Sequence, residues 1–587
     1  MKKLILSAAL LLTTMAASAV PAKSSWKTIT QSDGAQLRVM LMGDENFHYY
    51  KTTDGVMLIE EGGSFYYANA TGQTLVSSSR LAHELSERST EEQAFVDGMG
   101  TEQQHARRLA AQAPQVTMPC RAIGEANGAY EGSKKGIIIL VSFSDLDFVT
   151  ENPRETFEAM VNQPGYTNSY GAMGSVHDYF YDQSYGRFDL TFDVVGPYKA
   201  PNTMAYYGKN QGNYTDVNVR TLIKWAMRAA NEDVNYADYD WDGDKEVDQV
   251  FIVYAGYGEA QGAPAETIWP HESVLGGTWD ALMLDNVTLN TYACGQELAG
   301  KDSSDGTHLA GIGTICHEFS HCMGLPDFYD TDANTGANDT NYGTGTFDLM
   351  CGGSYNGNSW KPAAYTGYER NFCGWLDYQE LTDPCRVKDM QPITDGGPVF
   401  VTYNPANKNE YYLYETRTKF SGWDQGLYGS GLLIYHVNYI ASRWKNNTVN
   451  KKAAGNPCMQ VVAADNNYEE NTAGNIAKDL WPSTQGIKKI NEFSDTSTPA
   501  CTLFNKNTDG TNLLHIKLSN IKYTASTRTS SFTFNDGTED WTDPSGIEDV
   551  TLSLESSAMP LYNLRGQRVS DNAKGLLIRN GKKFFVK

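Results

Sequence analysis

His317-Glu318-Phe319-Ser320-His321-Cys322-Met323-Gly324-Leu325-Pro326-Asp327 is the stretch from which the rest of this sequence is best interpreted. Its two histidines stand four residues apart, so a helix places both imidazoles on one face, within reach of one metal ion. Gly324 lets the chain leave that helix through a left-handed turn, and Pro326 prevents the helix from resuming. We therefore expect Asp327 to fold back as a third ligand, which leaves one position of a tetrahedral zinc ion open, as in catalytic sites.

Glu318 follows the first histidine directly and lies on nearly the same helix face. In that position its carboxylate would point at a water on the metal rather than at the metal itself. Zinc lowers the pKa of such a water from about 15.7 to about 7, and Glu318 would accept the proton and return it to the leaving amine nitrogen. The pattern thus predicts His317 and His321 as zinc ligands and Glu318 as the catalytic acid–base group.

The identity of the third zinc ligand has alternatives. Asp330 and Asp332 follow Asp327 closely and offer the same carboxylate chemistry. A distant downstream Glu, as in the thermolysin class, is a competing arrangement. Gly324 argues against that arrangement, because a site with a distant third ligand does not need a sharp exit from the helix. Asp327 is the residue that we predict.

The extended motif resembles that of the M6, or immune-inhibitor-A-like, metallopeptidases of the metzincin type, in which a methionine turn follows. Phe347-Asp348-Leu349-Met350 ends 23 residues past Asp327, where such a turn is expected. The resemblance implies a zinc cofactor, an α/β metzincin-like catalytic domain and a hydrophobic floor under the metal formed by Met350. It covers residues 135–378 well and extends to the segments 410–417 and 429–437.

Two other polar side chains near these motifs are candidates for a role in the active site. Tyr355 follows Met350 by five residues, and its hydroxyl could stabilise the oxyanion of the tetrahedral intermediate. A packed aromatic residue after a glycine pair is the competing interpretation, and the sequence favours it. His271, in the Ile-Trp-Pro-His segment 268–271, could face the cleft, but we expect a structural histidine.

A run of alternating carboxylates occupies residues 238–248. It follows the start of an EF-hand loop at positions 1, 3, 5 and 6, with Gly243 supplying the tight turn. Gln249 stands at position 12 in place of the bidentate Glu, so Asp248 is expected to serve instead. A solvated acidic turn is the alternative. The predicted calcium ligands are Asp238, Asp240, Asp242, Asp244 and Asp248.

Composition limits the class of protein. The chain has 587 residues, enough for several domains, and it contains 35 Tyr and 54 Gly, which suits sheet- and turn-rich globular structure. A net charge of −23 argues against general nucleic-acid binding. No stretch reaches a transmembrane length, and residues 1–19 have the charged start, short apolar run and Ala-Ser-Ala end of a signal peptide. We expect a protein that is secreted or held at the cell surface.

The predicted domain order is a signal peptide (1–19), a pro-segment with a linker (20–133), an M6-like zinc peptidase domain (134–382), a β-rich accessory domain (383–538) and a C-terminal domain (546–587). The resemblance implies that the pro-segment is inhibitory. The basic C-terminal residues alternate in hydrophobicity and resemble a type IX secretion sorting domain, which would bring the secretion machinery as a partner; a small terminal β-hairpin module is the alternative. The fold class is therefore multidomain, with an α/β metzincin-like catalytic domain and C-terminal all-β domains.

Nine cysteines are present, and export permits disulfides whose pairing the sequence does not give. Cys316 and Cys322 flank the predicted metal-binding histidines, so we expect them to pack or pair there. Cys120 stands alone in the linker of the pro-segment. Its thiolate could fill the open position of the zinc and keep the enzyme latent, against the plainer alternative of a free or paired cysteine.

Together these features predict a secreted zinc-dependent endopeptidase that is made as a zymogen and acts on proteins or peptides. The alternative is a non-catalytic surface adhesin or binding protein built on a peptidase-like fold. Glu318 argues against the alternative, because a binding module has no use for that carboxylate. Glycan binding is a further possibility for residues 383–538 alone.

Overall fold

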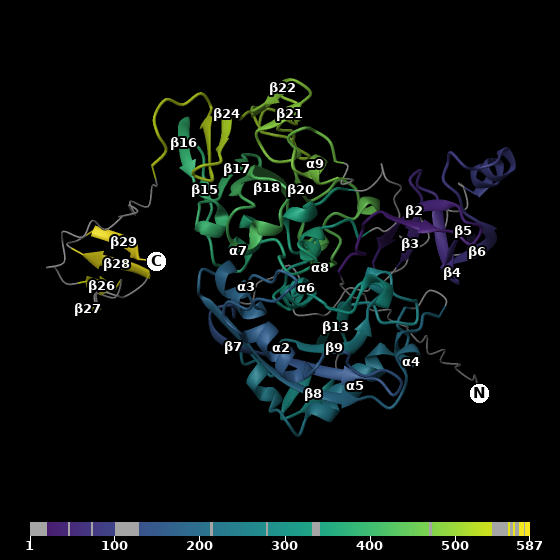
Figure 1. The fold of residues 1–587 in the computed structure, drawn as a ribbon. Helices are drawn as coiled ribbons and strands as arrows, with labels where there is room; N and C mark the ends of the chain where they lie inside the picture. Colours follow the sequence, from purple (N-terminus) through teal and green to yellow (C-terminus); the bar gives the residue numbers. More distant parts are fainter. Residues whose placement is uncertain are drawn as a thin grey trace, which may run out of the picture.

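The computed structural model describes residues 20–44, 47–71, 74–99, 128–211, 215–276, 280–331, 341–468 and 472–542, together with four short strands between 561 and 586 (Figure 1). Within these ranges every helix is too short or too polar to cross a bilayer. Figure 1 shows three bodies of sheet around the central helix α6 (Gly313–Cys322), and a fourth, C-terminal sheet set apart from them.

The first sheet is a meander in which each strand pairs antiparallel with the next. Along its second strand Leu37, Val39 and Leu41 are buried while their neighbours face outward, as the two-residue repeat of a half-buried strand requires. A helix at 90–99 follows the sheet. The strands are β1 (Lys27–Thr30), β2 (Gln36–Gly43), β3 (His48–Lys51), β4 (Met57–Glu61), β5 (Ser64–Thr71) and β6 (Thr74–Leu81).

The second sheet has the order β10-β13-β9-β7-β8 and is parallel except for β10 and the short strand β14, which both pair antiparallel with β13. Both faces are covered, which explains the unbroken apolar run in β7. Ile138 and Leu140 face one core, and Ile137 and Ile139 face the other. The strands are β7 (Gly132–Ser142), β8 (Phe188–Lys199), β9 (Val250–Tyr257), β10 (His271–Val274) and β13 (Thr291–Ala299), with β14 (His308–Leu309) paired to β13 and a separate hairpin of β11 (Leu282–Leu284) and β12 (Val287–Leu289).

Helices cover the two faces of this sheet. The core on one side includes residues of α2 (Pro153–Asn162), α3 (Val176–Gln183) and α6. The core on the other side includes residues of α4 (Met204–Gly208) and α5 (Val219–Ala230). The α6 helix is therefore held between the second sheet and the sheet of β15 to β20 that follows it in the chain, drawn in green in Figure 1.

Helix α6 is shorter than the 307–323 that the apolar spacing predicts. It begins at Gly313, because His308 and Leu309 pair with β13 as a strand instead. Gly311 and Gly313 pass so close to the backbone of Ser359 and Ser354 that a side chain would not fit at either position. The start of α6 is thus set by a close approach of two loops.

The third body is a sandwich of two sheets with orders β15-β17-β18-β19-β20 and β16-β25-β24-β23. Tyr412 and Tyr414 of β18 face the space between the sheets, whereas Tyr411 and Leu413 face the core shared with α6. The hydrophobic core around α6 therefore continues from the predicted catalytic domain (134–382) into the predicted accessory domain (383–538). The boundary between these two domains stays a prediction. The strands are β15 (Gln379–Glu380), β16 (Cys385–Met390), β17 (Phe400–Asn404), β18 (Asn407–Arg417), β19 (Gly431–Asn438), β20 (Met459–Val461), β23 (Phe493–Ser494), β24 (Lys517–Thr524) and β25 (Thr529–Phe534).

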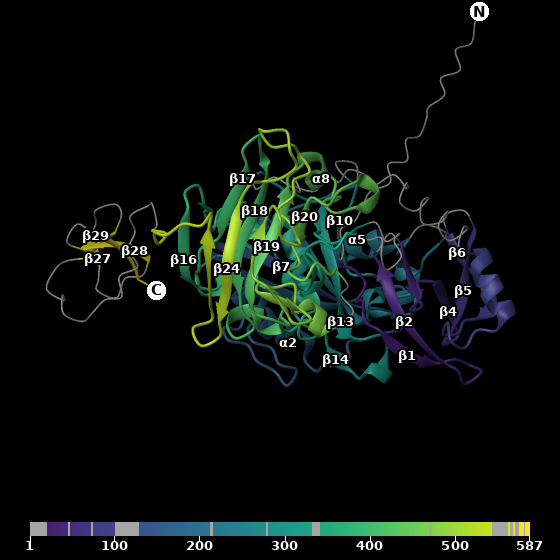
Figure 2. The ribbon, with the colours of Figure 1, turned by 90° about the horizontal axis from the view of Figure 1, so that it is seen from above.

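Short elements complete the chain. A hairpin of β21 (Ser483–Gln485) and β22 (Lys488–Ile490) joins the sandwich, and the C-terminal sheet contains β26 (Leu561–Asn563), β27 (Arg568–Val569), β28 (Gly575–Arg579) and β29 (Lys582–Val586). The remaining α-helices are α7 (Gly367–Phe372), α8 (Ala441–Lys445) and α9 (Ala473–Ile476). Among the 3-10 helices, η2 (Glu259–Gln261) and η6 (Gly352–Tyr355) contribute residues near α6. In Figure 1 the sandwich lies above the second sheet and the meander lies to the right, and in the view from above the meander again lies at the right-hand end (Figure 2).

Candidate active site

The structure brings together the three predicted metal ligands. Nε2 of His317 and Nε2 of His321 lie 3.2 Å apart on α6. Oδ1 of Asp327 lies 3.1 Å from the first and 3.5 Å from the second. All three side chains are fully buried. Asp330 does not join this cluster, because its carboxylate accepts hydrogen bonds from the backbone N–H groups of Asn341 and Lys452 instead.

The bonding of these side chains fits a metal ion. Nδ1 of His317 faces the carbonyl oxygen of Leu349 at 2.8 Å, and Nδ1 of His321 faces that of Leu325 at 2.7 Å. A carbonyl only accepts, so each Nδ1 carries the proton and each Nε2 keeps its lone pair. Oδ1 of Asp327 is buried and accepts no hydrogen bond in the described structure. Such an oxygen requires a cation, and a set of two imidazoles and one carboxylate suits zinc.

The turn after α6 places Asp327. Gly324 has φ of 88°, the left-handed conformation expected at the end of this helix, and its N–H donates to the carbonyl of His321 at 2.8 Å. Asn447 then fixes the side chain of Asp327: its Nδ2 donates to Oδ2 at 2.6 Å. Sequence reasoning missed Asn447, since it lies 120 residues downstream and no local pattern marks it.

Met350 lies where the methionine turn was expected. It is fully buried in the core that contains α6, and its carbonyl accepts from the N–H of Phe328 at 2.8 Å, one residue after the third ligand. The preceding residue, Leu349, supplies the carbonyl that orients His317. The turn thus supports two of the three ligands through its backbone. A role for the Met350 side chain as the floor of the site stays a prediction.

Glu318 is buried beside the histidines. Its Oε1 accepts from the backbone N–H of Val20 at 3.0 Å, while Oε2 has no hydrogen-bond partner among the described residues. Burial raises the pKa of this carboxyl well above its ordinary value, and His321 opposes that effect. A carboxyl with a raised pKa is suited to accept a proton and to return it.

Tyr355 and His271 differ in their surroundings. The hydroxyl of Tyr355 donates to the carbonyl oxygen of Pro21 at 2.7 Å, and burial raises its pKa far above the usual value. Its part in oxyanion stabilisation stays a prediction.

His271 is buried on β10, where Nδ1 contacts the carbonyl of Trp269 at 2.7 Å and Nε2 contacts the hydroxyl of Tyr292 at 3.1 Å. Both ring nitrogens are used within the fold, in keeping with a structural histidine.

The acidic loop gathers part of the predicted calcium set. Ligand atoms of Asp240, Asp242 and Asp244 all lie within 4.8 Å of one another, and Gly243 has φ of 81°. The other two carboxylates have different contacts. Asp238 accepts from the amide of Asn235 at 3.0 Å, and Asp248 is buried and accepts from the N–H of Trp241 at 2.6 Å. Calcium binding stays a prediction, centred on Asp240, Asp242 and Asp244.

Cys120 lies outside the described residues, so its predicted role as a latency thiol is untested. The other eight cysteines are buried. Cys316 and Cys322 belong to this set, and both pack in the core around α6 rather than pair with each other. The sulfur of Cys322 contacts the carbonyl of Phe319 at 2.9 Å.

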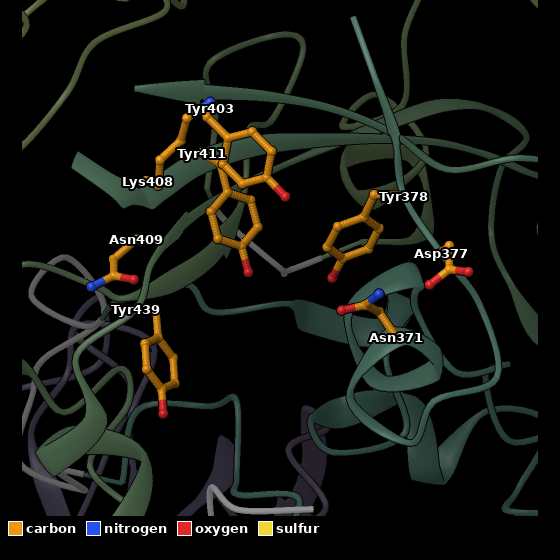
Figure 3. A pocket seen from close by; sticks show the side chains of 8 residues that line it. All are labelled: Asn371, Asp377, Tyr378, Tyr403, Lys408, Asn409, Tyr411 and Tyr439. Carbon is orange, nitrogen blue, oxygen red and sulfur yellow. The ribbon is translucent and has the colours of Figure 1, made fainter. Parts of the chain in front are cut away.

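A pocket of about 390 Å³ lies apart from the metal ligands, between α7 and the first strands of the sandwich (Figure 3). Four tyrosines dominate its wall, and Nζ of Lys408 lies 4.6 Å from the ring centre of Tyr403. None of the residues that line the pocket belongs to the metal cluster. The lining residues are Asn371, Asp377, Tyr378, Tyr403, Lys408, Asn409, Tyr411 and Tyr439.

A mixed sheet, a histidine-bearing helix packed against it and a buried glutamate between two candidate metal ligands are the features expected of a metallopeptidase catalytic domain. Comparison with known proteins agrees. Residues 127–376 match the family model described as immune inhibitor A peptidase M6, catalytic domain.

Two relatives each match part of the chain. The pre-pro-metalloprotease PrtV of Vibrio cholerae serotype O1 is 27% identical over 258 residues, which cover 39% of this chain and 28% of that protein. Immune inhibitor A of Bacillus thuringiensis subsp. alesti is 24% identical over 241 residues, 35% of each chain. The chain therefore spans about a third of the length of the curated relatives it matches.

Proposed function

We propose that this protein is a secreted, zinc-dependent endopeptidase made as a zymogen, which hydrolyses peptide bonds of protein or peptide substrates. The observation that supports it most is the buried cluster of His317, His321 and Asp327 with Glu318 between the histidines. The match of residues 127–376 to a peptidase catalytic domain supports the same reaction. The pro-segment, the zinc and the export route are parts of this proposal.

The two histidines and Asp327 would hold the ion, which when bound polarises a carbonyl and acidifies a water. The carbonyls of Leu349 and Leu325 keep both imidazoles in the tautomer that presents Nε2. Glu318 takes the proton of the attacking water on its carboxylate and delivers it to the departing amine nitrogen. Burial of Glu318 excludes bulk water from this transfer.

The decisive experiment is hydrolysis of casein by the activated protein with and without a zinc chelator, alongside the variant Glu318→Gln. We expect the chelator to abolish hydrolysis and Glu318→Gln to lower kcat by at least about 100-fold while zinc content stays stoichiometric. Glu380→Gln, at an exposed position of β15, is the matched control and should behave as wild type. Zinc binding without hydrolysis in any form would favour the adhesin alternative.

Two further parts of the proposal concern calcium binding and export. We propose that calcium stabilises the loop around Asp240, Asp242 and Asp244, and that the C-terminal residues from 546 act as a sorting domain for type IX secretion. The four-stranded arrangement of β26 to β29 is compatible with a small independent sorting module. Deletion of residues 546–587 should block export while leaving hydrolysis by the purified, activated protein intact; normal export of the truncated chain would contradict the sorting role.

A further inference from the structure

The tyrosine-lined pocket of Figure 3 combines aromatic rings with polar groups that the fold itself does not use. Its volume of about 390 Å³ falls within the range of about 300–1,000 Å³ that is usual for small-molecule sites. Helix α7 and the turn after it form one wall, and β17 and β18 form the other. The lining shares no residue with the metal cluster, so the proposed peptidase function does not account for the pocket.

The sheet supplies an aromatic surface. Tyr403 of β17 and Tyr411 of β18 stand directly opposite each other in the antiparallel register. Their ring centres lie 5.4 Å apart, and the ring centre of Tyr378 lies 6.2 Å from that of Tyr411. Each of these rings offers a flat apolar face and carries a hydroxyl at its edge. Such a wall suits a flat ligand that has an apolar face and a polar rim.

One hydroxyl in the pocket lacks a partner. In Figure 3 the hydroxyls of Tyr378 and Tyr411 point toward one another. The hydroxyl oxygen of Tyr378 is buried, yet it has no hydrogen-bond partner of good geometry among the described residues. A buried hydroxyl in that state is unfavourable, because it has lost its bonds to water and gained none in exchange. A ligand that brings a hydrogen-bonding atom to this position would remove the cost.

The charges of the lining favour a neutral ligand. Asp377 and Lys408 carry opposite charges, so the pocket has no strong attraction for either sign. Nζ of Lys408 lies 3.0 Å from Oε1 of Glu380 and 4.6 Å from the ring centre of Tyr403. The lysine is therefore already paired, and it covers a face of Tyr403 on which a cationic ligand would stack.

Polar groups at the rim remain available to a ligand. Asp377 and Asn409 are exposed, and their side chains bond to no other described residue. Nδ2 of Asn371 donates to the carbonyl oxygen of Leu376 at 2.8 Å, which leaves its Oδ1 as an acceptor. Carboxylates only accept, whereas amides and phenols both donate and accept. A ligand with several hydroxyl groups can satisfy all of them, since a hydroxyl also does both.

A sugar ring has this combination of properties. A pyranose presents an apolar face of C–H groups and a rim of hydroxyls, and a plain hexose carries no charge. We propose that the pocket binds a neutral hexose residue of a glycan or polysaccharide, with the apolar face of the sugar on Tyr411 and its hydroxyls bonded by Tyr378 and Asp377. The lining runs from 371 to 439, so this site draws on both sides of the predicted boundary at 382 and 383. The inference does not depend on the peptidase function.

The test begins with native electrophoresis of the full chain through gels that each contain one polysaccharide. We expect a neutral glucan, mannan or galactan to retard the protein, and a polyuronate to leave its mobility unchanged. Neutral oligosaccharides cut from the retarding polysaccharide, or released from glycoproteins, are then titrated by calorimetry to separate these two sources of the sugar. Tyrosine-lined grooves also accept proline-rich peptides, so one such peptide is titrated in parallel. Binding of the polyuronate alone, of the peptide alone or of no probe would overturn the proposal.

Variants then assign the binding to this pocket. Tyr378→Phe removes only the hydroxyl without a partner, so we expect a Kd for the oligosaccharide at least about tenfold weaker and an unchanged Tm. A hydroxyl with a purely structural role would give the reverse, a lower Tm with an unchanged Kd. Asp377→Ala should also weaken binding, and Asp383→Ala, exposed outside the pocket, is the matched control. Unchanged affinity in both Tyr378→Phe and Asp377→Ala would overturn the proposal.

The outcomes are independent of those for the peptidase function, because calorimetry is run with a zinc chelator present. A chain that binds the sugar and hydrolyses no peptide in any form would contradict the peptidase function and leave the sugar site standing. A chain that hydrolyses peptides and binds no neutral saccharide would overturn the sugar site and leave the peptidase function standing.

Discussion

Asn447 makes two hydrogen bonds with Asp327, one to the side chain of Asp327 and one to its backbone. Its Nδ2 donates to Oδ2 of Asp327 at 2.6 Å, and its Oδ1 accepts from the N–H of Asp327 at 2.7 Å. The oxygen that faces the histidines is thereby left free for a metal ion. Asn447 follows α8 in the sandwich part of the chain, so the candidate metal centre depends on a residue beyond the matched catalytic domain.

Replacing Asn447 should weaken metal binding. Asn447 has φ of 50°, so Asn447→Gly removes the amide without adding backbone strain. Loss of a partner that orients a ligand costs about 10–100-fold in metal affinity. Zinc affinity measured by competition with a chromogenic chelator checks this, with the exposed Lys445→Ala as control. Unchanged affinity in Asn447→Gly would show that Asp327 is positioned without it.

Removing Arg417 should destabilise the junction between the peptidase part and the sandwich. Arg417 is fully buried and makes two bonds of 2.6 Å to the carboxylate of Asp424 and one of 3.0 Å to Glu415. Arg417→Met would leave two buried carboxylates without their cation, which costs about 3–5 kcal/mol of the free energy of unfolding. Denaturant unfolding measures it.

The control for that experiment is an ion pair at the surface. Lys408 is 63% exposed and pairs with Glu380 at 3.0 Å. Lys408→Met should change the free energy of unfolding by less than about 1 kcal/mol. A similar small change in Arg417→Met would mean that the buried carboxylates take up protons and tolerate the loss.

His271 should make the fold sensitive to acid. Burial lowers its pKa to about 4, against a smaller opposing effect of the Trp269 carbonyl. The unfolded chain gains this proton below about pH 6.5 and the folded chain only below about 4, so the free energy of unfolding falls as pH drops through that window. The loss reaches up to about 3 kcal/mol by pH 4.

The comparison that isolates this effect is His271→Gln, which keeps a hydrogen-bonding side chain and does not titrate. Plots of the free energy of unfolding against pH for the two proteins should run parallel above about pH 7 and diverge below it, with the wild type falling more steeply. Parallel curves down to pH 4 would mean that His271 is protonated in the folded protein.

Calcium should raise the thermal stability of the protein through the acidic loop. A ligand that binds only the folded state stabilises it by about 2.7 kcal/mol at a concentration 100 times its Kd. We expect a calcium-selective chelator, in excess zinc, to lower Tm of the wild type and to leave Asp242→Asn unchanged. Asp238→Asn, which lies outside the cluster of three carboxylates, is the matched control. A purified protein without bound calcium would contradict the prediction.

Sequence patterns were informative wherever the physical cause is local. The four-residue spacing of His317 and His321 places both imidazoles on one face of a helix, and Gly324 adopts the left-handed turn that ends it. The continuous apolar run in β7 is likewise typical of a buried strand, and both faces of β7 are covered in the structure. By contrast, the helix was predicted to begin at residue 307, because apolar spacing does not register the strand pairing of His308 and Leu309.

The sequence by itself determined the pair of histidines on one helix face, the glutamate between them and the turn that returns Asp327, because each depends on bonds and torsions within about two helical turns. Only the tertiary structure decided what surrounds them. Asn447 and Val20 reach the site from 120 and 298 residues away, and chain segments so far apart meet only when hydrophobic cores pack and bring their loops together. No local pattern can encode such a meeting, since it depends on the packing of the whole chain.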